Sequence, residues 1–241
     1  MTLRRYLSSS GGTPATRDPL DVQYRPERPG EEPLVSAVVA EAFGGSIVAT
    51  LVDRLRASAD WIDGLSFVAD HEGRLIGHIL FTRGLLDAPE RLVDVLVLSP
   101  VSVSTAFQRM GVGATLIRHG LEQIAARPEP LVFLEGSPGY YRRFGFRPGG
   151  EHGFRRPSLR IPEPAFQVIK RAPYEPWMTG TLVYSRVFWD LDCVGLRDPV
   201  SAPRSSQSGI RREGQELGKV VGENELVEDG GGIGPGRVGK E

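Results

Sequence analysis

Apolar runs alternate with amphipathic segments through the middle of the chain. Residues 92–103 form an almost unbroken apolar run and residues 131–135 a shorter one, as expected for buried strands. Residues 33–43 and 47–59 instead carry apolar positions at helical spacing. The further predicted strands are residues 22–25, 66–70, 74–82 and 180–188, of which 66–70 and 74–82 flank a hairpin signal, His71-Glu72-Gly73.

Helices interspersed among strands, with a hairpin in the first half, predict an α/β (α+β) sandwich built on a mixed sheet. The two ends differ in composition from this middle part. Residues 1–20 are predicted to be a disordered leader, and residues 199–241, with ten glycines and no aromatic residue, a disordered tail. The folded unit is therefore predicted to be a single domain over residues 21–198.

Composition excludes several classes of function. No stretch approaches the roughly 20 apolar residues that span a bilayer, and no apolar region follows the N-terminal arginines as in a signal peptide. The formal net charge is −1, without a basic block, so no nucleic-acid partner is expected. Cys193 is the single cysteine, which excludes an internal disulfide and is typical of a reducing cytoplasm.

The most informative stretch is Gln108-Arg109-Met110-Gly111-Val112-Gly113-Ala114. It follows the 92–103 strand and precedes a helical pattern that runs from Leu116 to Ala125. A strand, a turn with two glycines and then a helix place backbone N–H groups at a helix N-terminus. Such a site binds anions, and a phosphate ester is its usual ligand.

Other interpretations of this turn are open to the same residues. A dinucleotide-binding fold requires a third glycine, where this chain has Leu116, and its turn opens the domain instead of following a hundred residues. A phosphate-binding loop of the P-loop type requires a lysine after the glycines, and none occurs there. A tight turn without any ligand is the purely structural alternative.

Two segments in order resemble the signatures of the GNAT superfamily of N-acetyltransferases. Residues 98–103 with Phe107-Gln108-x-x-Gly111-x-Gly113-Ala114 resemble its acetyl-CoA motif. Residues 136–148, which include Tyr140-Tyr141-Arg142-Arg143-Phe144-Gly145-Phe146, are similar to its second signature and look most like the YhbS-like branch. The stretches 159–166 and 180–184 also resemble that branch. One departure is Ser104-Thr105-Ala106, where the family usually has a proline-containing turn.

The resemblance implies a mostly antiparallel mixed sheet flanked by helices, with a splayed central pair of parallel strands. It implies transfer of an acetyl group from acetyl-CoA to an amine by direct attack. Backbone amides from Arg109 to Ala114 would hold the pyrophosphate of the cofactor, together with Gln108 and the Arg109 side chain. Main-chain groups over Val101, Ser102 and Val103 would bind the pantetheine arm as an added strand.

Tyr141 lies four residues before Gly145-Phe146, where many family members place a general acid that protonates the departing thiolate. The structural alternative is an aromatic packing residue. For a general base, Asp94 and Glu135 are open candidates, Asp94 because it interrupts an apolar strand and Glu135 because it ends one. His78 is interpreted as a satisfied sheet histidine. The other histidines form no metal-ligand spacing with one another or with Cys193, so no metal is predicted.

The predicted function is therefore an acetyl-CoA-dependent N-acetyltransferase in the cytoplasm. The sequence does not choose between a small-molecule and a protein amine, and it leaves the oligomeric state open, a homodimer included. The main alternative is a non-catalytic acyl-CoA-binding regulatory module. A nucleotide-binding oxidoreductase is a third hypothesis, which cofactor binding would separate from the other two.

Overall fold

The computed structural model describes residues 20–196, which form a nine-stranded sheet in the order β1-β2-β3-β4-β5-β8-β6. Strand β9 pairs with the far half of β3 and with β7. The pairs β4–β5 and β7–β9 are parallel and the others antiparallel. The strands are β1 (Gln23–Pro26), β2 (Ser66–His71), β3 (Arg74–Asp87), β4 (Leu92–Val103), β5 (Leu131–Glu135), β6 (Arg147–Pro148), β7 (Phe154–Arg155), β8 (Phe166–Lys170) and β9 (Gly180–Val183).

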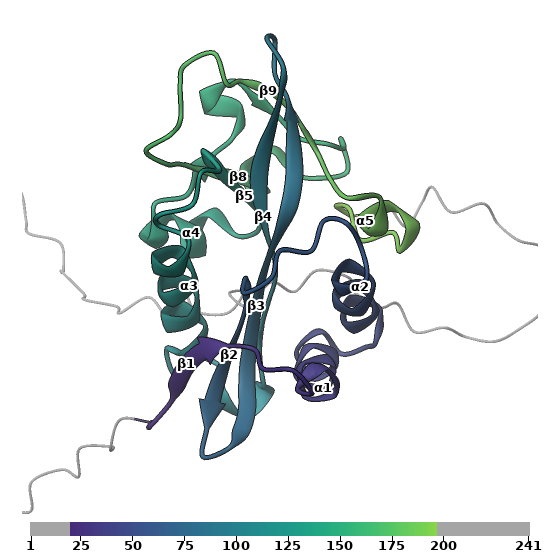
Figure 1. Ribbon diagram of the computed structural model, residues 1–241, viewed down its shortest axis with the longest axis vertical. Helices are drawn as coiled ribbons and strands as arrows, with labels where there is room; N and C mark the ends of the chain where they lie inside the picture. Colours follow the sequence, from purple (N-terminus) through teal and green to yellow (C-terminus); the bar gives the residue numbers. More distant parts are fainter. Residues whose placement is uncertain (1–19, 197–241) are drawn as a thin grey trace, which may run out of the picture.

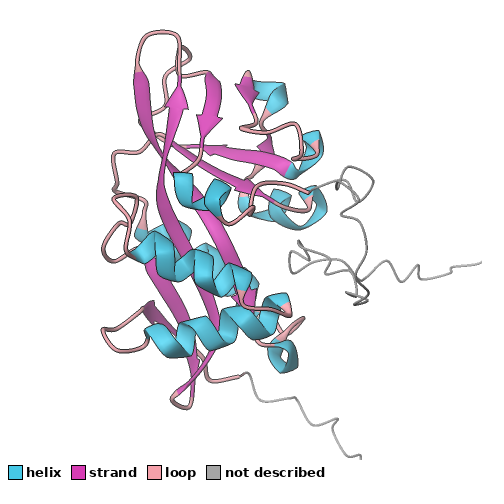
Figure 2. Cartoon of the chain, turned by 90° about the vertical axis from the view of Figure 1, so that its right-hand side faces the viewer, coloured by secondary structure: helices cyan, strands magenta, loops and turns pink. Residues whose placement is uncertain are grey.

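Helices cover both faces of this sheet, as Figure 1 shows, with α3 and α4 on one side and α1, α2 and α5 on the other. Figure 2 gives the view onto the second of these faces. The α-helices are α1 (Glu32–Phe43), α2 (Ile47–Arg56), α3 (Val112–Gln123), α4 (Pro138–Tyr141) and α5 (Arg186–Asp190), and short 3-10 helices are η1 (Thr105–Phe107), η2 (Arg142–Phe144), η3 (Gly150–His152) and η4 (Glu163–Ala165). The layers therefore match the predicted mixed sheet between helices.

The sheet separates two apolar cores. The first joins α1, α2 and α5 to one face of the sheet through residues such as Val39, Leu51 and Phe188. The second joins α3 and α4 to the other face through residues such as Leu116 and Tyr141. Side chains alternate along β5, so Leu131 and Phe133 belong to the first core and Val132 and Leu134 to the second. By the same alternation, Glu135 faces the side of α1 and α2.

The central parallel pair is splayed, as the resemblance implied. Strands β4 and β5 pair only at Leu96↔Val132 and Val97↔Phe133, and beyond that point they separate. On the other edge of β4, the register against β3 shifts, because Ile79 lies opposite Val101 but Phe81 opposite Leu98. This leaves Ser99 and Pro100 opposite a single residue of β3, which is a β-bulge. The bulge bends β4 where its parallel neighbour leaves it.

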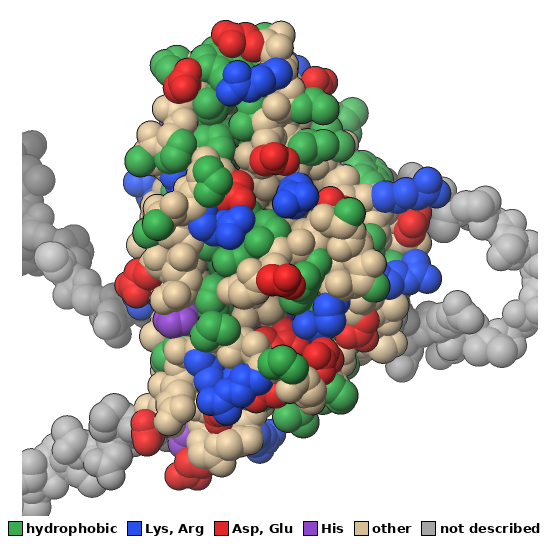
Figure 3. All heavy atoms as spheres, viewed as in Figure 1, with side chains coloured by type: hydrophobic (Ala, Val, Ile, Leu, Met, Phe, Trp, Pro, Cys, Tyr) green, Lys and Arg blue, Asp and Glu red, His purple; other side chains and the backbone are tan. Residues whose placement is uncertain are grey.

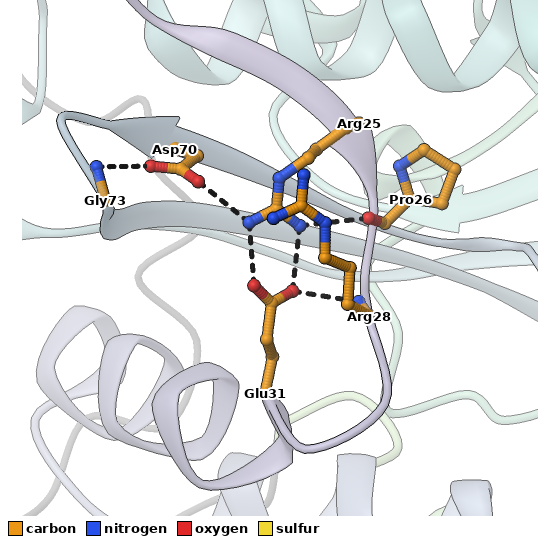
Figure 4. A network of polar contacts seen from close by, with 6 residues as sticks. All are labelled: Arg25, Pro26, Arg28, Glu31, Asp70 and Gly73. Atoms are coloured by element: carbon orange, nitrogen blue, oxygen red, sulfur yellow. Dashed lines mark hydrogen bonds and ion pairs between the residues drawn. The ribbon is translucent and has the colours of Figure 1, made fainter.

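One polar network fixes the position of α1 against the sheet (Figure 4). Arg25 of β1 donates to both carboxylate oxygens of Glu31, at 2.8 and 2.7 Å, and to Asp70 of β2 at 2.8 Å. Asp70 in turn accepts a hydrogen bond from the Gly73 amide in the β2–β3 turn. Strand β1, the start of α1 and the hairpin are thus tied together. The opposite end of α1 then reaches the end of β4, where it matters for the site.

Most predicted elements have the expected type, with four main differences. The segment 180–188 is not one strand: β9 ends at Val183, and the Ser185 side chain accepts from the Val187 amide to begin α5. Strand β3 extends five residues beyond the predicted end because β4 and β9 pair with it there. Helix α2 ends at Arg56 instead of residue 59, and strand β8 was missed. The predicted leader and tail lie, apart from residue 20, outside the described residues.

Candidate active site

The glycine-containing turn connects η1 to the start of α3. Arg109 has φ +62° and Gly111 φ +89°, so two residues of the turn lie in the left-handed region. This conformation costs a non-glycine residue on the order of 1 kcal/mol, and such residues concentrate at ligand sites. The first helical hydrogen bond runs from the Thr115 amide to the Gly111 carbonyl at 3.0 Å. The amides of Val112, Gly113 and Ala114 precede it, so the helix supplies them with no acceptor of its own.

The two glycines of the turn serve different purposes. Gly111 needs its left-handed φ, and a Cβ there would meet nothing within 4 Å. Gly113 has ordinary helical geometry, but a Cβ would lie 3.3 Å from both the Tyr140 hydroxyl and a Val103 methyl group. The missing side chain of Gly113 therefore lets the start of α3 pack against the end of β4 and against α4. This close packing is a second reason for glycine, besides the expected approach of a phosphate.

The register of β4 decides which main-chain groups face the gap. The Ser104 amide donates to Ile76 of β3, so in this antiparallel ladder Ser102 and Ser104 bond toward β3. Val101 and Val103 then direct their N–H and C=O groups to the opposite edge, where β5 has separated. The Gln108 side chain donates to the Val103 carbonyl at 3.1 Å from that edge. The structure thus brings Val101, Val103 and Gln108 to the gap, whereas the buried Ser102 donates its hydroxyl to the His78 carbonyl.

Glu41 holds the turn that follows β4, and the sequence alone did not reveal this role. From the end of α1 its carboxylate accepts from the Thr105 amide at 2.8 Å and from the Ser104 hydroxyl at 3.0 Å. The Thr105 amide lowers the pKa of Glu41, so the Glu41 carboxylate stays charged at neutral pH. Here the carboxylate holds the turn that follows β4, in place of the proline of the family pattern. The signal available in the sequence was the pair of hydroxyl residues, Ser104 and Thr105, after the predicted strand, together with the carboxylate of Glu41 near the end of a predicted helix.

A cavity of about 430 Å³ lies at the separation of β4 and β5. Its walls come from the bulge of β4 (residues 98–101), from residues 135–138, from the α1–α2 region and from the C-terminal segment around residues 162–165 and 192–196. Leu98, Val101 and Tyr141 belong to the core on the α3 side, whereas Val48 and Leu51 belong to the core on the α1–α2 side. The cavity therefore passes through the sheet and connects its two faces.

Tyr141 lines this cavity from the α3 side. It is 3% exposed, and its ring packs edge-on against Tyr140 and Phe146, with centroids 5.0 and 5.9 Å away. Burial raises the pKa of its hydroxyl well above the ordinary tyrosine value, so the group keeps its proton at neutral pH. Tyr140 does not line the cavity: its ring lies beneath the Arg143 guanidinium, 4.4 Å from the centroid. Only one tyrosine of the pair, Tyr141, therefore lines the cavity.

Glu135 lines the same cavity from the opposite side of the sheet. Its carboxylate accepts from the Gly195 amide at 3.2 Å and interacts with the buried Tyr184 hydroxyl. Burial is the largest influence and raises the pKa of Glu135, although Tyr184, Gly195 and Arg160 oppose the shift. A carboxylate with a raised pKa is a better proton acceptor near neutral pH. The structure thus brings Glu135, and not only Tyr141, to the place where β4 and β5 separate.

The other candidate base does not reach this cavity. Asp94 has a side chain that is 68% exposed, near the start of β4, at 3.9 Å from Arg83. His78 is fully buried, its Nε2 lies 3.0 Å from the Ser66 hydroxyl, and burial lowers its pKa to about 3. His78 is thus a neutral sheet histidine, but not the satisfied one that was predicted, because its buried Nδ1 has no hydrogen-bond partner. Within residues 20–196, no group of three or more His, Cys, Asp or Glu side chains is placed to hold a metal ion.

The surface of this domain carries mixed charge. On the face shown in Figure 3, basic and acidic side chains are interspersed, and no broad basic area of the kind that binds nucleic acid is visible there. No helix among the described residues is long and apolar enough to cross a membrane.

Comparison with known proteins agrees with this geometry. Residues 23–149 match the family model described as an acetyltransferase (GNAT) domain. The chain is 40% identical over 134 residues to an uncharacterized N-acetyltransferase of Escherichia coli (strain K12), YjhQ; the matched region covers 54% of this chain and 71% of the relative.

Two solved structures are similar over most of their length. The GNAT family N-acetyltransferase YhbS of Escherichia coli, in complex with CoA, is 27% identical with a TM-score of 0.64, covering 72% of this chain and 94% of that one. A GNAT family acetyltransferase from Brucella melitensis, in complex with acetyl-CoA, is 32% identical with a TM-score of 0.56, covering 70% and 99%. The chain therefore belongs to the GNAT family of acetyltransferases, and the predicted family and fold are confirmed.

Proposed function

We propose that this GNAT acetyltransferase binds acetyl-CoA on the α3 side of the sheet and transfers the acetyl group directly to an amine that enters from the α1–α2 side. The observation that carries the proposal is the cavity through the sheet, with Tyr141 at one face and Glu135 at the other. The two similar structures with CoA and acetyl-CoA support the choice of cofactor.

The cofactor would lie along the groups that the β4 register exposes. The amides at the start of α3 and the left-handed turn at Arg109 and Gly111 would hold the pyrophosphate. The pantetheine arm would bond to the main chain of Val101 and Val103 in the gap left by β5. This arrangement would place the thioester in the cavity beside Tyr141.

The reaction needs a proton acceptor for the amine and a proton donor for the thiolate, and these two side chains can supply them. Glu135 takes one proton from the ammonium group of the acceptor, and the neutral nitrogen attacks the thioester carbonyl carbon. The C–N bond forms, the C–S bond breaks, and the Tyr141 hydroxyl protonates the departing thiolate of CoA. The surplus proton on the amide nitrogen restores the tyrosine, and Glu135 releases the proton that it accepted to solvent. The products are the N-acetylated amine and CoA with a free thiol.

Binding and turnover test this proposal in sequence. Calorimetry with acetyl-CoA, CoA, NAD and ATP should give binding of the first two alone. A thiol-release assay with a panel of amines should then show release that depends on the amine. Acetyl-CoA binding without amine-dependent release would favour the non-catalytic acyl-CoA-binding module, and NAD binding would favour an oxidoreductase.

A further inference from the structure

The part of the cavity that faces α1, α2 and the C-terminal segment is predominantly apolar. Phe43, Val48 and Leu51 line it from the two helices, and Pro162, Pro164 and Leu196 line it from the C-terminal segment. Few polar side chains are available there to receive hydroxyl or amide groups of a ligand. An acceptor with many polar groups would lose its hydration in this space without replacement.

The charges in the cavity have one sign. Glu135 and Asp192 are the only carboxylates among its described lining residues, and none of the lining residues within 20–196 is Lys, Arg or His. Asp192 lies 2.7 Å from Arg160, so its charge is already compensated. Among the described residues Glu135 forms no ion pair: its partners are the Gly195 amide and Tyr184, and the Arg160 guanidinium acts on it only from beyond ion-pair distance. A ligand cation would therefore find its counter-charge at Glu135.

The size of the cavity limits the acceptor. Ligand cavities commonly measure roughly 300–1,000 Å³, and the 430 Å³ here must also hold the thioester end of the cofactor. The remaining space suits a compact body instead of a folded protein surface or a long polycation.

From this lining, charge and size we propose that the acceptor is a compact primary amine on an apolar body without a carboxylate, its ammonium group bound at Glu135 and its body between Phe43, Val48 and Leu51. The inference rests on the proposed function and deepens it by naming the substrate class. A carboxylate on the acceptor would enter beside Glu135 and Asp192, and the nearby Arg160 guanidinium is already paired with Asp192, which opposes binding.

A matched set of amines tests the substrate class. Phenethylamine and phenylalanine share the same aromatic body and amine, and differ by one carboxylate. We expect kcat/KM for phenethylamine to exceed that for phenylalanine at least about 100-fold. Spermidine, a long polycation, should also be a poor substrate. Faster turnover of phenylalanine or spermidine would overturn this inference and leave the acetyltransferase function intact. Acetyl-CoA binding without turnover of any amine would overturn both.

A variant of the cavity wall tests where in the cavity the acceptor binds. Phe43→Ala removes a partly buried wall residue and should raise KM for phenethylamine about tenfold, without changing acetyl-CoA affinity. Ethylamine, whose body is too short to fill the wall, should be affected much less. Leu159→Ala removes a highly exposed apolar side chain elsewhere and serves as the control. An equal loss for both amines, or a loss of acetyl-CoA affinity, would contradict the assigned position.

Discussion

The two faces of the sheet build their parts of the proposed site in different ways. On the α3 side, contiguous residues from the end of β4 to the start of α3 present main-chain groups, and glycines set their conformation. On the α1–α2 side, the walls come from segments as distant as Phe43, Glu135 and Leu196, and they contribute side chains. A cofactor common to a whole family can be bound by backbone, whereas the acceptor must be selected by side chains. The difference predicts that changes on the two sides separate cofactor binding from chemistry.

The largest effect should come from Tyr141. Tyr141→Phe keeps the buried ring and its contacts with Tyr140 and Phe146, and removes the hydroxyl alone. Because general acid catalysis contributes on the order of 100- to 10,000-fold, kcat should fall by about that factor. Acetyl-CoA affinity by calorimetry should stay unchanged. Tyr140→Phe is the matched control, and an undiminished kcat in Tyr141→Phe would leave Tyr141 a packing residue.

Glu135→Gln should cause a comparable loss of rate on the other face. The glutamine oxygen can still accept from the Gly195 amide, but the side chain can no longer take a proton. We expect kcat/KM to fall about 100-fold or more, and the decline of activity toward acidic pH to disappear. In the parent protein that decline should be centred above the ordinary glutamate pKa, because burial raises the pKa of Glu135 and only the carboxylate form accepts a proton.

Asp94→Asn is the control for this variant, since it removes an exposed carboxylate that does not line the cavity. It should leave both kcat/KM and the pH profile unchanged. If Asp94→Asn reproduced the loss and Glu135→Gln did not, the assignment of the base would be wrong.

A smaller effect is expected from Glu41 of α1, which holds the turn on the side of the sheet where we propose that the cofactor binds. Glu41→Gln weakens charged hydrogen bonds to the Thr105 amide and the Ser104 hydroxyl. Such bonds contribute about 1.5–3 kcal/mol at most and less at an exposed site, so KM for acetyl-CoA should rise roughly tenfold. The KM for the amine should change little. Glu122→Gln, an exposed carboxylate on α3, is the control, and equal changes in both variants would exclude the anchoring role.

The smallest expected effect is the change in the stability of the fold when Glu135 is replaced. Burial raises the pKa of folded Glu135 above its unfolded value, so the folded protein binds the proton more tightly. The carboxylate therefore destabilises the fold above its folded pKa, and this cost fades as pH falls below the unfolded pKa. Glu135→Gln should show a higher Tm than the parent at neutral pH, and the difference should vanish under acidic conditions. A lower Tm at neutral pH would mean that the charged form is stabilised.

The sequence predicted the cofactor side better than the acceptor side. Local signals, such as the apolar run 92–103 and the glycine at position 111, indicate the strand, the turn and the helix that follows. In the structure this glycine has a left-handed φ. The register that turns Val101 and Val103 outward but Ser102 toward β3 depends on the pairing with β3, which no local pattern reveals. Glu41, α5 and the cavity wall around residues 192–196 depend on contacts between distant segments. For the same reason Asp94 and Glu135 could be separated only in the structure.

A single-turnover experiment tests the central claim, direct transfer across the cavity, most directly. Protein in excess over acetyl-CoA labelled in the acetyl group is mixed with or without phenethylamine, and the label is followed by mass spectrometry of the intact protein and of the small molecules. The account predicts that the label stays on acetyl-CoA without amine and moves to the amine when it is added, with no acetylated protein at any time. Label on the protein before the amine arrives, above all on Cys193 in the cavity wall, would contradict direct attack.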